Sequence, residues 1–510
     1  MLRSSIQCAT TTHRHASHHD HHDTLLPPLP PYTAPRRPLL HLCSPAPTAL
    51  LCAQTTANPL RTTARSQGDA STASLGRPYR AIVYVNLRGG CDSFNVLIPH
   101  SNCVNASGGP HDLFSDYASV RGPVIAMPKE TLKTISASNQ VCGTFGVHPV
   151  YKTVHDLYTQ ERPEAAFIAN VGPLVEPTSK QAYKRHKDKG GVRVPPGLFA
   201  HNVQQKVVAV VHAQETQRAK GIMGRILKEL NQQSPSGQPK FSVASYSTSG
   251  SAKFLDGAPS RPYMLPKNGD ILMYTREHEL RDEVANLTAT ESAGIFSESY
   301  ASIVESSIAD TIKLRDALGL PLSRSYSGGV APQFKQVAKI IKAQRDGVLS
   351  TEREAFYVSL GAFDTHNWPL PDSKLQQVED GLAPFVAEMK ALGMWDNVTV
   401  VVGSEFGRTL TSNGKGTDHG WGGHTFLMGG AVKGGIIHGE YPRTLGTDHE
   451  LNAGRGRVIP TTSWESVWHA LGQWLGLEEK SLHRVLPNLR NFQGCTGPGC
   501  GVMTAEEMFK

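Results

Sequence analysis

The residues best suited to chemistry lie between Asp396 and Gly435, where charged and imidazole side chains directly follow a predicted strand. An apolar, β-branched run over 398–402 predicts that this strand is buried. The candidate functional residues behind it are Glu405, Arg408, Asp418, His419 and His424. Carboxylate oxygens and imidazole nitrogens are donors that divalent cations prefer, and the intervening glycines let the backbone bring them close. The pattern favours a metal site over the alternative, a polar loop whose histidines bond to backbone.

A second candidate segment follows a strand predicted over 81–87. It carries Arg88, Asp92 and Ser93 around a Gly-Gly pair. The carboxyl ends of strands are where α/β sheets hold their chemistry, which makes Asp92 a candidate functional residue. The alternative is structural, with the glycines forming a turn and Asp92 capping the segment that follows.

A third candidate segment follows the buried strand predicted over 355–360 and contains Asp364 and His366. Alternate residues of an extended segment point the same way, so this Asp-x-His sequence predicts a compact pair of ligands. An Asx turn beside an incidental histidine is the alternative interpretation. His201 lies where a helix is predicted to start, which is a natural place to face an anion.

The elements between these segments predict an α/β domain. A helix that begins at Asp372 has apolar residues at helical spacing and stops at Gly393. A Thr462-x-x-Glu465 capping box predicts the start of another helix. Because strands and helices alternate along the chain, we expect a doubly wound, mostly parallel sheet with helices on both faces.

The charge and hydropathy patterns argue against two function classes. The formal net charge is +7, but residues 1–79 contain seven arginines and three aspartates, so +4 of it lies there. The body of the chain has no basic run with interleaved aromatic residues, so we expect no nucleic-acid partner. No apolar run approaches the ~18 residues that span a bilayer, so we expect no transmembrane helix.

The composition also predicts the domain organisation. Residues 1–78 are rich in Pro, Thr and His and lack sustained periodicity, which predicts a disordered segment. Their Arg-rich, acid-poor character is typical of organellar transit peptides, and a secretory signal is the alternative. We therefore expect an organelle (plastid or mitochondrion) or secretion as the destination, a folded domain over 79–494, and a C-terminal tail over 495–510.

The eight cysteines allow two disulfides in the folded region. Cys103 can reach Cys142 across an insertion that we expect to be irregular, over 101–145, and Cys495 can close a small loop with Cys500. These pairings would suit an oxidising compartment. Free buried thiols are the alternative.

Four segments in order resemble a known family: Leu87–Asn95, Gly361–His366, Ser404–Thr409 with Asp418–Gly420, and Gly454–Ser463. They resemble domain of unknown function family 1501, in the alkaline phosphatase/sulfatase-like superfamily, and the likeness runs over 79–492. The resemblance implies an alkaline phosphatase-like sheet with one or two divalent metals at the strand ends. Zinc is the expected metal, with calcium, magnesium and manganese as alternatives.

Carried over by position, the resemblance implies these metal ligands: Asp92, Asp364, His366, Glu405 and either His419 or His424. Glu405 and Phe406 stand where the superfamily has Asp and His, which alters one metal position. The resemblance also makes Arg88 and Arg408 candidates to hold an oxyanion bidentately.

The nucleophile departs from the superfamily pattern. Relatives attack with a Ser, Thr or modified Cys at a helix start, and this family usually has Phe-Ser-His where the chain reads Phe199-Ala200-His201. The hydroxyl is therefore missing. Three possibilities follow, namely attack by metal-bound hydroxide, a relocated nucleophile such as Ser93, or no catalysis.

The leading hypothesis is a metal-dependent hydrolase of a small anionic phosphate or sulfate ester. Its candidate catalytic residues are Arg88, Ser93, His201 and Arg408. The alternatives are a non-catalytic binding protein that keeps the fold, and a structural surface protein that uses Cys495 and Cys500. The sequence gives no indication of the oligomeric state.

Overall fold

The computed structural model describes residues 77–510 apart from 216, 233–238, 270, 272–276 and 290–293. The transit- or signal-like segment predicted over 1–78 therefore lies outside the described residues, except for its last two. No helix in the described part of the chain is long and apolar enough to span a membrane.

The centre of the fold is a sheet in the order β14-β6-β13-β10-β1-β9-β7-β8, with β15 also beside β6. Its strands are β1 Arg80–Leu87, β6 Ala165–Gly172, β7 Val243–Ser247, β8 Tyr263–Met264, β9 Arg353–Leu360, β10 Val398–Gly403, β13 Gly423–Met428, β14 Ile437–His438 and β15 Thr462–Ser463. All neighbouring pairs are parallel except those of β13, which runs antiparallel to both β10 and β6. The predicted mostly parallel sheet is confirmed.

Strand β13 runs antiparallel because no crossover helix separates it from β10. The chain leaves β10 at Gly403, forms the hairpin of β11 (Arg408–Ser412) and β12 (Thr417–His419), and re-enters the sheet at Gly423. A connection that stays at one end of a sheet can only return the chain antiparallel. This return places the hairpin at the carboxyl end of the central strands.

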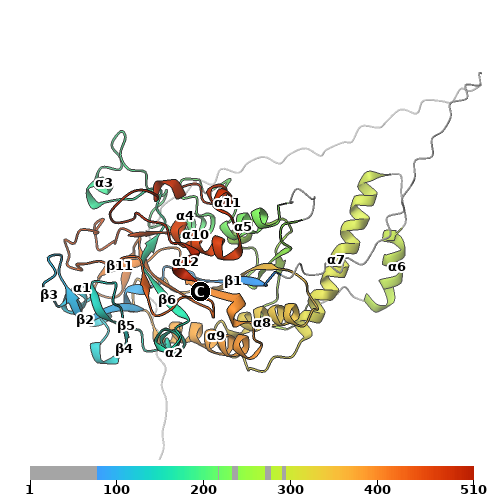
Figure 1. The fold of residues 1–510 in the computed structure, drawn as a ribbon, viewed down its shortest axis with the longest axis horizontal. Coiled ribbons are helices and arrows are strands. Elements are labelled where there is room, and N and C mark those ends of the chain that lie inside the picture. The colour runs from blue at the N-terminus through green and yellow to red at the C-terminus, as the bar shows by residue number, and fades with distance from the viewer. Residues whose placement is uncertain (1–76, 216, 233–238, 270, 272–276, 290–293) are drawn as a thin grey trace, which may run out of the picture. The chain divides into compact units, whose positions relative to one another are not determined.

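Helices cover both faces of the sheet, as predicted (Figure 1). They are α1 Leu113–Ile125, α2 Lys152–Thr159, α3 Lys180–Lys184, α4 His201–Val210, α5 Ile222–Leu230, α6 Glu277–Ala289, α7 Ile295–Gly319, α8 Ala331–Arg345, α9 Asp372–Ala391, α10 Trp464–Leu475, α11 Glu479–Val485 and α12 Ala505–Met508. Successive residues of β1 belong to two different hydrophobic cores. Val83 belongs to the core that contains residues of α8 and α9, and Ile82 belongs to the core that contains residues of α5 and α10. This explains why the strand is apolar at nearly every position.

The insertion predicted to be irregular over 101–145 is in fact ordered. A second sheet, β3-β2-β5-β4, is formed by β2 Leu97–Val104, β3 Pro110–His111, β4 Lys133–Ser136 and β5 Cys142–Val147. Cys103 lies opposite Cys142 in this sheet, and the two form a disulfide. Cys495 and Cys500 form the other, so both predicted pairings are confirmed.

The two predicted helix starts, at Thr462 and at Asp372, each differ by one residue from the N-caps in the structure. The N-cap of α10 is Ser463, not Thr462, and its side chain accepts a hydrogen bond from the Ser466 amide. Thr462 is held in β15 against β6, so the helix begins one residue later, and Glu465 is buried and accepts from Asn488. Asp372 is the first residue of α9, whose N-cap is Pro371.

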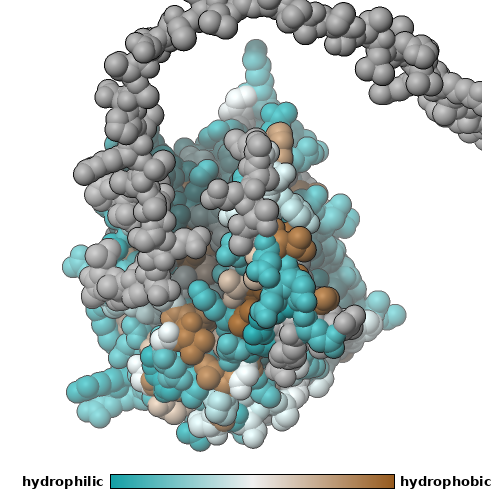
Figure 2. All heavy atoms as spheres, turned by 90° about the vertical axis from the view of Figure 1, so that its right-hand side faces the viewer, coloured by the Kyte–Doolittle hydropathy of each residue, from teal (hydrophilic) through white to brown (hydrophobic). Residues whose placement is uncertain are grey.

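Helices α6 and α7 carry the four most exposed large apolar side chains among the described residues, which are Leu287, Phe296, Tyr300 and Ile303. Figure 2 views the molecule from the side where Figure 1 shows these two helices, and apolar and polar side chains are interspersed there. The C-terminal residues return to the sheet region, where Phe509 is buried and bridges Val432.

Candidate metal centre

The candidate centre lies where three neighbouring parallel strands end. Strands β9, β1 and β10 are adjacent, so the loops that follow Leu360, Leu87 and Gly403 meet at one edge. The first turn of α4 and the β11–β12 hairpin approach the same edge and add His201 and His419. Meeting of such loops at strand ends is the usual origin of a site in an α/β sheet.

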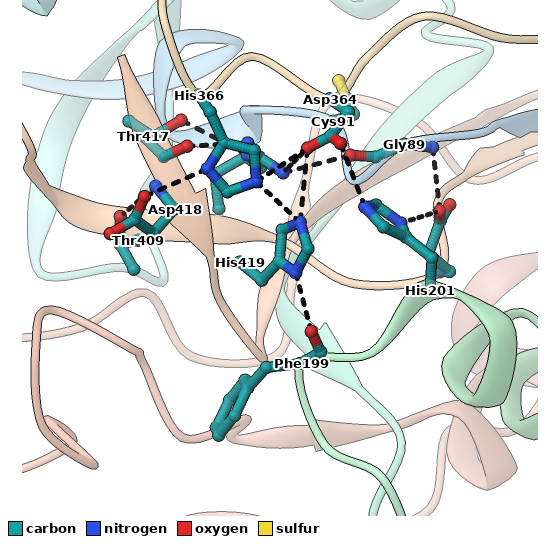
Figure 3. Close-up of polar contacts among 12 residues, drawn as sticks. Gly89, Cys91, Phe199, His201, Asp364, His366, Thr409, Thr417, Asp418 and His419 are labelled. Atoms are coloured by element: carbon teal, nitrogen blue, oxygen red, sulfur yellow. Dashed lines mark hydrogen bonds and ion pairs between the residues drawn. The ribbon is translucent and has the colours of Figure 1, made fainter. Parts of the chain in front are cut away.

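Three imidazoles converge on one carboxylate (Figure 3). The Oδ2 atom of Asp364 lies 3.3 Å from His201 Nε2, and its Oδ1 atom lies 3.1 Å from His366 Nε2 and 3.3 Å from His419 Nε2. The Nε2 atoms of His366 and His419 are themselves only 2.9 Å apart. Ligand atoms of His201, Asp364 and His419 all lie within 4.8 Å of one another.

The outer nitrogen of each imidazole faces a hydrogen-bond acceptor. His419 Nδ1 lies 2.6 Å from the Phe199 carbonyl oxygen, which can only accept. His201 Nδ1 lies 2.9 Å from Glu405 Oε1, and His366 Nδ1 lies 3.0 Å from Asp418 Oδ1. These acceptors hold the proton of each neutral ring on Nδ1, so all three Nε2 lone pairs point inward.

With the protons on Nδ1, the inward-facing atoms are all acceptors. Two imidazole lone pairs at 2.9 Å, beside a carboxylate, require a positive charge or a proton between them. His201 Nε2 is buried and has no hydrogen-bond partner among the described residues. Three imidazoles and one carboxylate form a donor set that suits zinc, so the residues present fit a divalent cation.

Protonation competes with a cation at His201. Its hydrogen bond to Glu405, which outweighs burial, raises the pKa of His201 above its ordinary value. Burial lowers the pKa of His419 and so keeps that ring neutral. Burial raises the pKa of Asp364, but the hydrogen bond and charge of Arg408 outweigh it and hold the pKa below its usual value. Asp364 is thus ionised at neutral pH.

Glu405 lies behind His201 and does not reach the centre as a ligand. Its side chain is fully buried, and Oε1 accepts from the Gly89 amide at 2.8 Å, from His201 Nδ1 at 2.9 Å and from Gln205 Nε2 at 3.3 Å. Asp418 lies behind His366 in the same manner, with Oδ1 beside His366 Nδ1, and it also accepts a hydrogen bond from Asn413. Carboxylates in this position orient a ligating imidazole and increase its basicity.

The two arginines predicted to hold an oxyanion differ sharply in environment. Arg408 is fully buried and donates to Asp364 Oδ1 at 2.8 Å, to the Gly89 carbonyl at 3.2 Å and to the Thr417 carbonyl at 2.6 Å. Its donors are thereby occupied by the protein, so Arg408 positions Asp364. Arg88 is exposed at the end of β1, and no side-chain partner is found for it among the described residues.

Three predicted residues lie elsewhere in the fold. Asp92 forms a buried ion pair with Arg121 of α1, away from the three imidazoles. Ser93 is buried and accepts a hydrogen bond from the His424 amide at 2.7 Å. His424 accepts from the Asn170 amide at 3.1 Å, stacks on Tyr441, and has its pKa lowered to about 3 by burial.

Local backbone geometry explains why Asp92, Ser93 and His424 lie elsewhere in the fold. Gly89 and Gly90 both have positive φ, and the turn they form directs the chain inward, so Asp92 and Ser93 enter the core. His424 is the second residue of β13, and its side chain faces a cavity of about 30 Å³ that Ser93 and Tyr151 also line. The structure thus separates His424 from His419, which the sequence left as alternatives.

Phe199 and Arg121 were not anticipated as supporting residues. Phe199 has φ of +71°, which is an outlier for a bulky residue, and its carbonyl fixes His419. Its position directly before Ala200 and His201 was the only available signal. Arg121 lies in the segment predicted to be irregular, directly before Gly122-Pro123, and nothing in the sequence there distinguishes it from a surface arginine.

Comparison with solved structures gives weak overall likenesses. The chain is similar to the lipoteichoic acid synthase LtaP from Listeria monocytogenes, with 10% identity, a TM-score of 0.27, and coverage of 78% of this chain and 72% of that one. It is similar to the PsFucS1 sulfatase from Pseudoalteromonas sp., with 11% identity, a TM-score of 0.30, and coverage of 84% and 76%. The C-terminal periplasmic domain of EptC from Escherichia coli gives 11% identity, a TM-score of 0.33, and coverage of 84% and 90%.

The sequence comparisons identify a family without a described activity. None of the curated proteins matches the chain. Residues 79–485 match the family described as protein of unknown function (DUF1501), which confirms the resemblance inferred from the four motifs. Since this match spans most of the chain, the protein belongs to the DUF1501 family.

Proposed function

We propose that this protein is a hydrolase of phosphate or sulfate esters that holds a divalent cation, zinc, between His201, Asp364, His366 and His419. The observation that carries the proposal is the convergence of three Nε2 lone pairs on one carboxylate. Each ring is fixed in this orientation by an acceptor behind it. A divalent cation supplies Lewis acidity at such a site.

The chain's own residues prepare the centre. Arg408 keeps Asp364 ionised and fixes its Oδ1 atom. Glu405 and Asp418 orient two of the imidazoles, and the buried Glu405 does so without contact with solvent. Preorganised groups of this kind avoid reorganisation during the reaction.

Water is the nucleophile in this proposal. Ala200, at the N-cap of α4, has no hydroxyl, and Ser93 is buried against the His424 amide. The oxygen of water forms the new bond to phosphorus or sulfur, the bond to the ester oxygen breaks, and the proton that water gives up ends on the leaving alcohol. Arg88 is the exposed cation available at the end of β1 to meet an anionic substrate.

The test is the metal content of the purified full-length chain, measured by elemental mass spectrometry, together with hydrolysis of 4-nitrophenyl phosphate and 4-nitrophenyl sulfate. We expect bound zinc and turnover of at least one ester in the wild type, and loss of both in His419→Ala. His155→Ala, which removes an imidazole from the surface of α2, is the matched control. A wild-type chain that takes up no divalent cation contradicts the proposal.

The second candidate is a non-catalytic protein that binds the cation. Ala200 favours it, because the first turn of α4 reaches the centre without a hydroxyl. Ala200→Ser distinguishes the two. An increase in turnover by orders of magnitude would indicate an enzyme that has lost its nucleophile, whereas bound zinc with no turnover in either protein supports the binding role.

We further propose that residues 1–78 act as a leader to an organelle or to secretion, ahead of a domain over 79–494 and a tail over 495–510. The composition of the leader supports this, and the two disulfides suit an oxidising compartment. N-terminal sequencing of the mature protein tests it, since an intact Met1 would contradict cleavage.

A further inference from the structure

Arg457 contacts two residues that belong to or support the candidate metal centre, His419 and Phe199. Its Nε atom donates to the carbonyl oxygen of His419 at 3.2 Å. Its guanidinium lies over the ring of Phe199, with Cζ 4.0 Å from the ring centroid. His419 and Phe199 are themselves joined by the hydrogen bond that fixes the imidazole. The position of Arg457 is therefore tied to that of a proposed ligand.

The outer nitrogens of this guanidinium are free to bind. Among the described residues, Nη1 and Nη2 of Arg457 have no hydrogen-bond partner, and no carboxylate lies within ion-pair distance of them. Asp418 acts on Arg457 only at longer range, and Arg455 adds a second positive charge nearby. A half-buried arginine whose outer nitrogens have no partner in the protein can pair with an anionic ligand.

Phe199 adds a second, independent observation. A bulky residue at φ of +71° is strained, and strain of this kind persists where the surroundings enforce it, often at functional sites. The strained conformation serves two purposes here. It turns the Phe199 carbonyl towards His419 Nδ1 and places the ring beneath Arg457.

We propose that Arg457, supported by Phe199, forms a subsite for a tetrahedral oxyanion beside the metal centre. The two Nη atoms present parallel N–H groups that suit two oxygens of a phosphate or sulfate group. This inference rests on the proposed function and assigns to Arg457 the role that Arg408 cannot fill, because the donors of Arg408 are occupied by Asp364 and backbone.

The test is the binding of inorganic phosphate to the full-length protein, measured by isothermal titration calorimetry with and without stoichiometric zinc. We expect Arg457→Gln to weaken phosphate binding at least tenfold while zinc content is unchanged. Arg457→Lys keeps the charge but loses the planar pair of donors. Its affinity for phosphate should therefore lie between those of the wild type and Arg457→Gln. Arg484→Gln removes the same charge from α11, where Arg484 pairs with Glu229, and should bind phosphate like the wild type.

A further variant separates the ring from the charge. Phe199→Gly keeps the carbonyl and relieves the positive φ, so zinc should still bind while phosphate affinity falls several-fold. Unchanged phosphate affinity in both Arg457→Gln and Phe199→Gly overturns the subsite, as does a zinc-loaded wild type that binds no phosphate.

Failure of the proposed metal centre can be distinguished from failure of the Arg457 subsite. If the wild type takes up no zinc, the metal centre is wrong. The subsite is then supported if the zinc-free wild type binds phosphate at least tenfold more tightly than Arg457→Gln, and it is overturned if the two are equal. Far-UV circular dichroism of each variant confirms that the fold is retained.

Discussion

Two groups of polar residues lie at the ends of the central strands, and they differ in what surrounds them. The outer group, His201, Asp364, His366 and His419, has side chains that are 21–44% exposed, and acceptors lie behind its imidazoles. The inner group, Asp92, Ser93, Arg121 and His424, is at most 9% exposed. Both contain the residue types of a metal site, but only the outer group directs several lone pairs at one point.

The comparison shows that residue type and strand-end position are insufficient to define a site. In the inner group the residues pair with one another, Asp92 with Arg121 and Ser93 with the His424 amide. Asp92 Oδ1, Arg121 Nε and His424 Nε2 are buried without a hydrogen-bond partner among the described residues, but they do not converge on one point. In the outer group an acceptor lies on the far side of each ring, and the Nε2 atoms face one another and the Asp364 carboxylate. Several ligand atoms that converge on one point therefore indicate a ligand, whereas a buried ion pair with isolated polar atoms around it indicates structure.

The largest expected effect is on cation binding. His419→Ala should abolish stoichiometric zinc binding, because it removes one of the converging Nε2 atoms. His424→Ala should leave zinc content unchanged, although it creates a cavity in the core. Elemental mass spectrometry on both purified variants measures this. Loss of zinc in His424→Ala would break the distinction between the two groups.

The next effect is on stability and concerns the inner group. Asp92→Asn leaves the Arg121 charge buried without its partner and should lower the free energy of unfolding by roughly 3–5 kcal/mol. Asp364→Asn also removes the charge partner of a buried arginine, Arg408, but the Asp364 side chain is 44% exposed and Arg408 keeps the Gly89 and Thr417 carbonyls as acceptors, so the loss should be smaller. Urea denaturation of the zinc-free proteins provides the values, and similar losses in both variants would contradict the assignment.

A smaller effect should come from the residue behind His201. Glu405→Gln keeps an oxygen that can accept from His201 but removes the negative charge, so zinc affinity should fall by roughly 10–100-fold. Competition with a chromogenic zinc chelator measures the change. Glu379→Gln, which alters a buried carboxylate that accepts from Thr153, is the control and should not change zinc affinity.

The smallest effect is the pH dependence that His424 gives to folding. Burial lowers its pKa from 6.5 to about 3, so the unfolded chain binds the proton more readily than the folded one. Its contribution to stability is therefore complete above pH 6.5 and is lost as the pH falls towards 3. Between pH 7.5 and pH 5 we expect the wild type to lose about 1–2 kcal/mol more than His424→Phe. Equal losses in urea denaturation at the two pH values would show that His424 is not buried as a neutral ring.

Much of the fold followed from the sequence. The runs over 81–87, 355–360 and 398–402 predicted β1, β9 and β10, because strands covered on both faces must be apolar throughout. The ordered sheet within 101–145 was missed, since its strands β2 and β4 are partly exposed and carry mixed residues. The reversed strand β13 could not be predicted, because its direction depends on the length of the β11–β12 connection.

The candidate site was predictable in content but not in arrangement. The Asp-x-His pair at 364–366 and the Asp-His pair at 418–419 were recognised from spacing, and the structure brings them together. Which of His419 and His424 faces the centre depends on the β11–β12 hairpin, which positions His419, and on the register of β13, which positions His424. The tautomer of each ring depends on acceptors from distant parts of the chain, such as Phe199, and no local pattern encodes those contacts.

The centre is assembled from parts of the chain that are far apart in sequence. Phe199 and His419 are separated by 220 positions, and His201 and Glu405 by 204. Contacts of such long range form late in folding, because the intervening chain must be ordered first. A nascent or partly folded chain therefore lacks the converging imidazoles. Under the proposed function, metal uptake would therefore mark completed folding, since the ligands meet only after the whole domain has closed.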